Sequence, residues 1–104
     1  MVDVVELAKA ILSVAYHAKG DTEIRVETDD YSEDDIYKLI DTIVGDLEPH
    51  KLKMRGVRIN YSVYGKLSSS PTYAENGRVR RGIVYVIDDQ LDFQKIEITL
   101  RHRV

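Results

Sequence analysis

The stretch TEIRVETDDYSEDDIYKLIDTIVGDLEPHKLKM, residues 22–54, changes its hydrophobic period twice, and these changes decide the fold. At its start Ile24 and Val26 alternate with charged residues, which predicts a short strand over 22–27. Alternation resumes after Pro49, so the stretch predicts a strand, a helix and a second strand. Between the two strands, apolar residues recur at the spacing of one helix face: Ile36, Leu39, Ile40, Ile43, Val44 and Leu47.

The start of this helix is marked by Ser32 and by an acidic first turn, residues 33–35. A hydroxyl at the N-cap and carboxylates in the first turn satisfy free backbone N–H groups and the helix dipole. We therefore expect a helix over 32–47, ended by Pro49. The acidic run 29–35 could also bind a hard cation or a basic partner. Its spacing matches no standard ligand loop, so we predict no metal site and no cofactor.

The segments on either side of this stretch are also periodic. Apolar residues at helical spacing predict a helix over 3–18, which Gly20 ends. Downstream, an alternating segment over 51–64 changes phase at Gly56, as is typical of a β-bulge. The remaining segments are a predicted loop over 66–77 and predicted strands over 78–87 and 93–102.

The predicted order α-β-α-β-β-β is typical of a two-layer α+β domain. We expect one domain over residues 1–104, with two helices packed on one face of a four-stranded, mixed but largely antiparallel sheet. The crossover through the second helix predicts that strand 22–27 lies parallel to strand 51–64. Tyr61 and Tyr85 share the phase of the inward-facing residues, so we expect both in the core.

The composition limits the compartment and the chemistry. The absence of cysteine excludes disulfides and thiolate metal sites. No apolar run approaches the roughly 18 residues that a membrane span needs, and the first residues are acidic rather than basic. We expect a cytoplasmic protein that does not enter a membrane. The chain has few Asn and Gln residues, and 32% of its residues are charged. Both features are more common in proteins of thermophiles.

The charge is divided between the two halves of the chain. Residues 1–50 hold thirteen Asp and Glu against four Lys and Arg, and residues 51–104 hold five against eleven. The basic half is the half with predicted strands and several tyrosines, which suggests a polyanion, most simply DNA or RNA. Arginine and lysine would bind phosphates, and Tyr64 and Tyr73 would stack on unpaired bases. The expected interface consists of Lys53, Arg55, Arg58, Tyr64, Lys66, Tyr73, Arg78, Arg80 and Arg81.

Two other interpretations of the basic strands stay open. Cations on exposed strands can prevent edge-to-edge aggregation of sheets. They can also bind an acidic protein surface, and the acidic and basic halves of two copies could join head to tail as an assembly module. An enzyme is not expected, because His17, His50 and His102 lie on different predicted elements without a nucleophile pattern. No glycine-rich phosphate loop is present either.

Several segments resemble the Alba family of archaeal chromatin and RNA-binding proteins. These segments are the helix ending at Gly20, TEIRVET (22–28), LIDTIV (39–44), PHKLKM (49–54) and IEITLRHR (96–103). The resemblance implies a homodimer whose basic β-hairpins reach along a nucleic acid. The hairpin that it implies here carries Arg55, Arg58, Arg78, Arg80 and Arg81. The chain departs from the family pattern at 28–31, where an acidic turn replaces a basic one, and by an additional strand before the last one.

Overall fold

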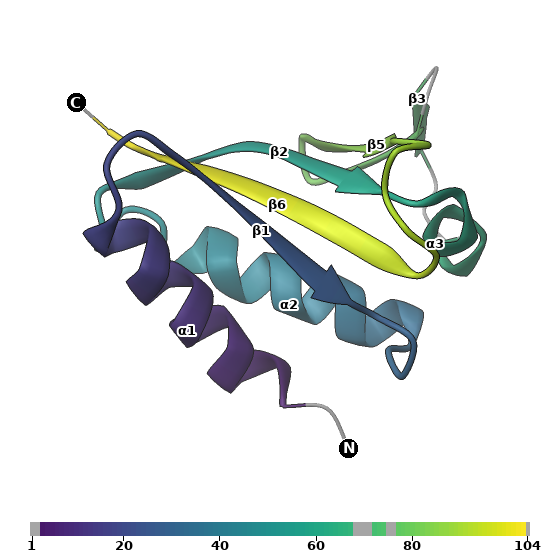
Figure 1. The fold of residues 1–104 in the computed structure, drawn as a ribbon, viewed down its shortest axis with the longest axis horizontal. Coiled ribbons are helices and arrows are strands. Elements are labelled where there is room, and N and C mark those ends of the chain that lie inside the picture. The colour runs from purple at the N-terminus through teal and green to yellow at the C-terminus, as the bar shows by residue number, and fades with distance from the viewer. Residues whose placement is uncertain (1–2, 68–71, 75–76, 104) are drawn as a thin grey trace.

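The computed structural model describes residues 3–67, 72–74 and 77–103, with only the backbone given at 72–74, 77 and 78. Two helices lie under one face of a mixed sheet, and a short third helix lies at one end (Figure 1). This architecture is α+β, as predicted. The elements are α1 (Val4–His17), β1 (Asp21–Glu27), α2 (Glu33–Gly45), β2 (Leu52–Ile59), α3 (Tyr61–Lys66), β3 (Thr72–Ala74), β4 (Gly77–Arg80), β5 (Ile83–Ile87) and β6 (Lys95–His102).

The two long helices lie where the sequence predicts them. Ser32 Oγ accepts a hydrogen bond from the N–H of Asp35 at 3.2 Å, and the Asp35 carboxylate accepts one from the N–H of Ser32 at 3.0 Å. This reciprocal capping box sets the first residue of α2. It also gives the acidic first turn a structural role that needs no ligand.

The strand order is β1-β6-β2-β5-β4-β3, so the described residues form six strands rather than the four predicted. β1 and β2 point in the same direction, but β6 lies between them and pairs antiparallel with both. The prediction that these two strands are parallel is therefore confirmed, although they are not neighbours in the sheet. β6 takes this central place because Ile96, Ile98 and Leu100 give it a fully buried inner face. The parallel pair that makes the sheet mixed is β2 with β5.

The predicted β-bulge in β2 is confirmed. The register between β2 and β6 shifts between Met54 and Gly56. The additional residue keeps Leu52 and Val57 on the same buried side of the strand, although their spacing is odd. Residues on both sides of the bulge thus contribute to one core.

The predicted strand 51–64 ends early, because residues 61–66 form α3. Asn60 caps this helix by accepting from the N–H of Ser62 at 2.9 Å, and its amide donates to the carbonyl of Leu91 at 2.7 Å. Tyr61 consequently faces solvent with 67% of its surface exposed, so its predicted place in the core was wrong. Tyr85 is 1% exposed, as predicted.

The predicted strand 78–87 is divided by a tight turn. Arg81 and Gly82 have φ angles of 53° and 79°, and two successive left-handed residues are typical of a type I′ hairpin. β4 and β5 are the two arms of this hairpin, and β5 then runs parallel to β2. The predicted loop 66–77 contains β3, which pairs with β4, while residues 68–71 and 75–76 lie outside the described part.

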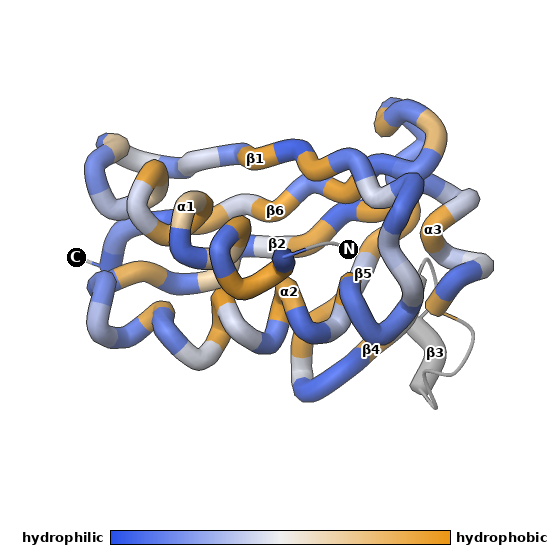
Figure 2. Tube along the Cα trace, turned by 90° about the horizontal axis from the view of Figure 1, so that it is seen from below, coloured by the Kyte–Doolittle hydropathy of each residue, from blue (hydrophilic) through white to orange (hydrophobic). Residues whose placement is uncertain are grey.

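The two long helices cover different parts of the same face of the sheet. α1 contacts β1, β6 and α2. α2 covers the same face of the sheet farther from β1, where its Tyr37 packs edge-on against Tyr85 of β5 with 6.0 Å between ring centroids. In Figure 2, α1 lies between β1 and α2. Among the helices in the described ranges, none is long and apolar enough to cross a membrane.

Replacing Ser32 with Ala should lower the free energy of unfolding by about 1 kcal/mol, because the N–H of Asp35 loses its acceptor. Urea denaturation followed by circular dichroism measures this change. Ser13→Ala is the matched control, since Ser13 is exposed within α1 and alanine is the better helix former. Equal stability of both variants would contradict a capping role for Ser32.

Candidate nucleic-acid interface

In the part of the chain that the structure describes, one face of the sheet carries no helix. Three cationic side chains of β2 project from this face. Leu52, Val57 and Ile59 point to the helices, so the alternate residues of β2 point away from them. These residues are Lys53, Arg55 and Arg58, which we call the β2 stripe. All three are exposed.

Two members of the stripe have no ion-pair partner in the part of the chain that the structure describes. Within the described residues, Lys53 and Arg55 make no ion pair. Arg58 is paired with Asp88 at 3.3 Å but keeps 59% of its side chain exposed. Lys53, Arg55 and Arg58 therefore lie together on the exposed face of β2.

The bulge places Arg55 between two shallow depressions. The first, of about 210 Å³, is lined by Arg55, Arg58 and Thr99 together with acids of the β1 edge. The second, of about 320 Å³, lies between β2 and the β4–β5 turn and includes Arg55, Val84 and Val86. Val84 and Val86 are 41% and 39% exposed. A cation beside exposed apolar side chains is a surface on which a phosphate and a base can both find a partner.

The cations of β1 and β6 on the same face are neutralised by cross-strand pairs. The buried carboxylate of Glu97, 4% exposed, accepts from Arg25, and this hydrogen bond raises the pKa of the Arg25 guanidinium. Among the described residues of β1, β2 and β6 on this face, the cations without an ion pair therefore lie on β2. The pairs are Arg25 with Glu97 at 3.0 Å, Arg101 with Asp21 at 3.5 Å and Lys95 with Glu27 at 3.7 Å.

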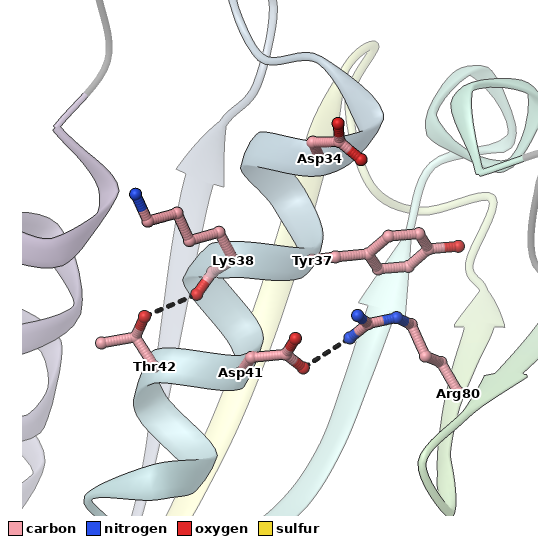
Figure 3. Close-up of a pocket in the computed structure, with 6 residues that line it drawn as sticks. All are labelled: Asp34, Tyr37, Lys38, Asp41, Thr42 and Arg80. Atoms are coloured by element: carbon pink, nitrogen blue, oxygen red, sulfur yellow. Dashed lines mark hydrogen bonds and ion pairs between the residues drawn. The ribbon is translucent and has the colours of Figure 1, made fainter.

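Arg80 lies on the opposite, helix-covered side. Its guanidinium is 4.2 Å from the ring centroid of Tyr37 and donates to Asp41 at 2.5 Å (Figure 3). The hydrogen bond to Asp41 raises the pKa of Arg80. Arg81 reaches the other oxygen of Asp41 at 3.5 Å. These arginines hold the β4–β5 hairpin against α2, which gives them a structural role. Their predicted role in phosphate binding stays a prediction.

The surface around this contact is hollowed but electrically mixed. A depression of about 440 Å³ is lined by two acids, two bases, a tyrosine and a threonine. Figure 3 shows that the side chains of Asp41 and Arg80 point toward each other across it. This arrangement is typical of an interelement ion pair rather than of an anion site. The lining residues are Asp34, Tyr37, Lys38, Asp41, Thr42 and Arg80.

Lys66 is also engaged within the protein. Its ammonium donates to the carbonyl of Thr28 at 2.7 Å and to that of Tyr31 at 3.2 Å. Lys66 thereby fixes the loop after β1 against α3. The sequence could not show this contact, because 38 residues separate Lys66 from Thr28.

The tyrosines have different surroundings from those expected. Tyr64 is partly buried and stacks on Tyr61, with 5.7 Å between centroids and 29° between planes. Tyr61 is therefore the outer ring of this pair. The predictions for Tyr73 and Arg78 concern side chains outside the described part; their backbones pair with each other across β3 and β4.

The three histidines, which the sequence places on separate elements, surround one tyrosine. Ring centroids lie 5.2, 6.1 and 6.3 Å from that of Tyr16 for His17, His50 and His102. No local pattern predicts this cluster, because it forms only when the ends of α1 and β6 meet the loop between α2 and β2. Within the described residues, no group of three or more histidines or acids could hold a metal ion.

Comparison with protein-family models, with curated protein sequences and with solved structures finds no match for this chain. The Alba resemblance thus stays a prediction. The single hairpin that it implies is not formed, because Arg55 and Arg58 lie on β2 whereas residues 78–81 lie beyond β5. The function must be inferred from the residues and their geometry.

The burial of Tyr85 predicts a loss of stability in alkali. Burial raises its pKa above the unfolded value of about 10. The neutral Tyr85 phenol contributes its full stabilisation of the folded state below the unfolded pKa of about 10. This contribution is lost as the pH rises above that pKa, because the unfolded chain releases the phenolic proton first. Tyr85→Phe should therefore flatten the decline in unfolding free energy between about pH 9 and 11, measured by urea denaturation. Tyr61→Phe, at an exposed ring, should retain the decline, and identical curves for Tyr85→Phe and the wild type would contradict the assignment.

Proposed function

We propose that this protein binds nucleic acid, without catalysing a reaction, through the helix-free face of its sheet. The observation that carries the proposal is the β2 stripe: three exposed cations follow one strand, and two of them lack an ion pair in the described residues. Neighbouring cations on the same face are already paired with carboxylates. Unpaired cations in a row attract a polyanion and release its counterions.

The dimensions of the stripe suit a phosphate backbone. Side chains two residues apart on one strand face are separated by about 6.6 Å. Long side chains at such intervals can each reach a different phosphate along a strand. Arg101 lies opposite Lys53 in the register between β6 and β2, but its charge is paired with Asp21, so the stripe itself carries the proposal.

The acidic first turn of α2 does not face the β2 stripe. The acidic first turn of α2 lies in the helical layer, on the opposite side of the sheet from the stripe. A polyanion on the helix-free face is therefore separated from those carboxylates by the sheet. DNA and RNA are both compatible with backbone contacts of this kind, since phosphate contacts carry no sequence information.

The rival function is the assembly module, in which the stripe binds an acidic surface of another protein or of a second copy. It uses the same cations, and it also predicts association that weakens with salt. The two functions differ in the ligand. Sedimentation of the protein alone, with and without Ala at the stripe residues, separates them, because self-association through the stripe requires these cations.

Simultaneous Ala substitution of the three stripe residues should weaken nucleic-acid binding at low salt at least about tenfold. It should also lower the slope of log K against log salt by about 2 to 3, because that many phosphate contacts are lost. Fluorescence anisotropy with single- and double-stranded DNA and RNA measures both quantities. The matched control removes the same charge elsewhere, with Ala at Lys9, Lys19 and Lys38.

The outcomes separate the possible sites. Unchanged binding in the stripe variant would reject the β2 site. Loss of binding in Arg80→Ala/Arg81→Ala equal to that of the stripe variant would move the site to the β4–β5 hairpin. No binding of the wild type to any of the four nucleic acids, with self-association that the stripe variant loses, would favour the assembly module.

Tyr61 supplies a second prediction for the same function. Its ring is exposed and already stacked on Tyr64, so a base can stack on its outer face without reorganising the helix. Tyr61→Ala should weaken binding of single strands by a factor of roughly five or more and leave duplex binding nearly unchanged. Tyr61→Phe keeps the ring and should bind like the wild type. Equal effects of the Ala variant on single strands and duplexes would contradict stacking.

A further inference from the structure

The edge of the sheet at β1 has no partner strand among the described residues. β1 pairs with β6 along seven residues, and its other side carries backbone N–H and C=O groups that no described strand uses. Such an edge is a template for another strand. Its side chains decide whether a partner is repelled or accepted.

The flank of α1 above this edge is apolar. Tyr16 contacts His50 and His102 and therefore marks the flank that faces α2 and the start of β2. By helical spacing, Val14 and Ala10 lie on the opposite flank, on the β1 side, and Val14 is 57% exposed. Leu7 and Ile24 are only partly buried on that side. In Figure 2 no helix lies on the side of α1 away from α2.

We propose that β1 is the interface of a homodimer, in which the β1 strands of two copies pair antiparallel about a two-fold axis at Ile24. The two sheets then become continuous. The α1 helices of the two copies approach each other across the axis and cover Val14. This inference is independent of the proposed nucleic-acid binding.

The charges of β1 are compatible with this register. An axis at Ile24 places Glu23 opposite Arg25 of the second copy, and the symmetry makes this pair twice. An axis at Arg25 would oppose two arginines, and an axis at Glu23 would oppose two glutamates. Asp21 faces Glu27 in the proposed register. Both are already paired within their own sheet, with Arg101 and Lys95, and Arg25 is likewise paired with Glu97, so it would contact one glutamate within its sheet and one across the axis.

The strand that pairs with the free edge of β1 comes from a second copy, because this edge is complementary to itself. Directly opposed residues of opposite charge stabilise an antiparallel pair, and opposed like charges destabilise it. An unrelated strand would need the same alternation of charge to match. The closed two-fold pair also excludes an open-ended head-to-tail array, which uses two different surfaces.

Sedimentation equilibrium without nucleic acid tests the interface. The wild type should be a dimer, and Glu23→Arg should shift it to monomer, because four arginines then meet at the axis. Val14→Lys should have the same effect through the α1 flank. The matched controls, Glu6→Arg and Ser13→Lys on the far side of α1, should stay dimeric, and circular dichroism should show all variants folded.

Cross-linking tests the register. The chain has no cysteine, so a single introduced thiol has one possible partner. Directly opposed Cα atoms lie about 4.5–5.5 Å apart, within the range of a disulfide. Ile24→Cys should therefore form a covalent dimer on mild oxidation, and Thr22→Cys should not. A monomeric wild type at all concentrations, or a dimer that survives both interface variants and gives no Ile24→Cys cross-link, would overturn the proposal.

Discussion

The insertion of β6 between β1 and β2 is the constraint on which the rest of the structure depends. Its inner side chains, Ile96, Ile98 and Leu100, are fully buried under the helices. Burial of three such side chains contributes roughly 5–9 kcal/mol before the loss of conformational entropy is counted. On its outer side, the buried charge of Glu97 lies opposite Arg25 of β1 and Arg58 of β2 in the strand register. A buried carboxylate needs such partners, since an unpaired one is costly.

The parts of the fold that could be predicted are those with local causes. Helix α2, its Ser32 cap and the bulge at Gly56 each follow from residues within a few positions of each other. α3 could not be predicted, because the alternation of apolar residues continues through residue 63 and the strand ends only where Asn60 bonds to Leu91, a contact between distant residues. The turn at Arg81 was missed because a non-glycine residue with positive φ is uncommon.

The candidate site also has one part that local sequence predicts and one part that depends on contacts between distant residues. Alternation correctly placed Lys53 and Arg55 on one face, and core residues of the same strand showed which face that was. For Arg80 the alternation gave a face but not its direction, which is set by pairing with Ile83 on β5 and by Asp41 on α2. An interaction between elements that lie far apart in sequence has no local pattern. Charge counts alone therefore overestimate the cations available to a ligand.

The proposed dimer and the proposed binding face are physically compatible. A two-fold axis perpendicular to the sheet keeps both β2 stripes on the same face. Five strand spacings separate the two stripes, or about 24 Å. This distance is about three Debye lengths at physiological salt, so repulsion between the stripes is largely screened. In the proposed dimer the Glu23–Arg25 pairs would lie opposite each other across the axis, well within a Debye length, where salt screens them less. Electrostatics at the edge therefore favours dimerisation, while the stripes stay available to bind one polyanion at two places with increased avidity.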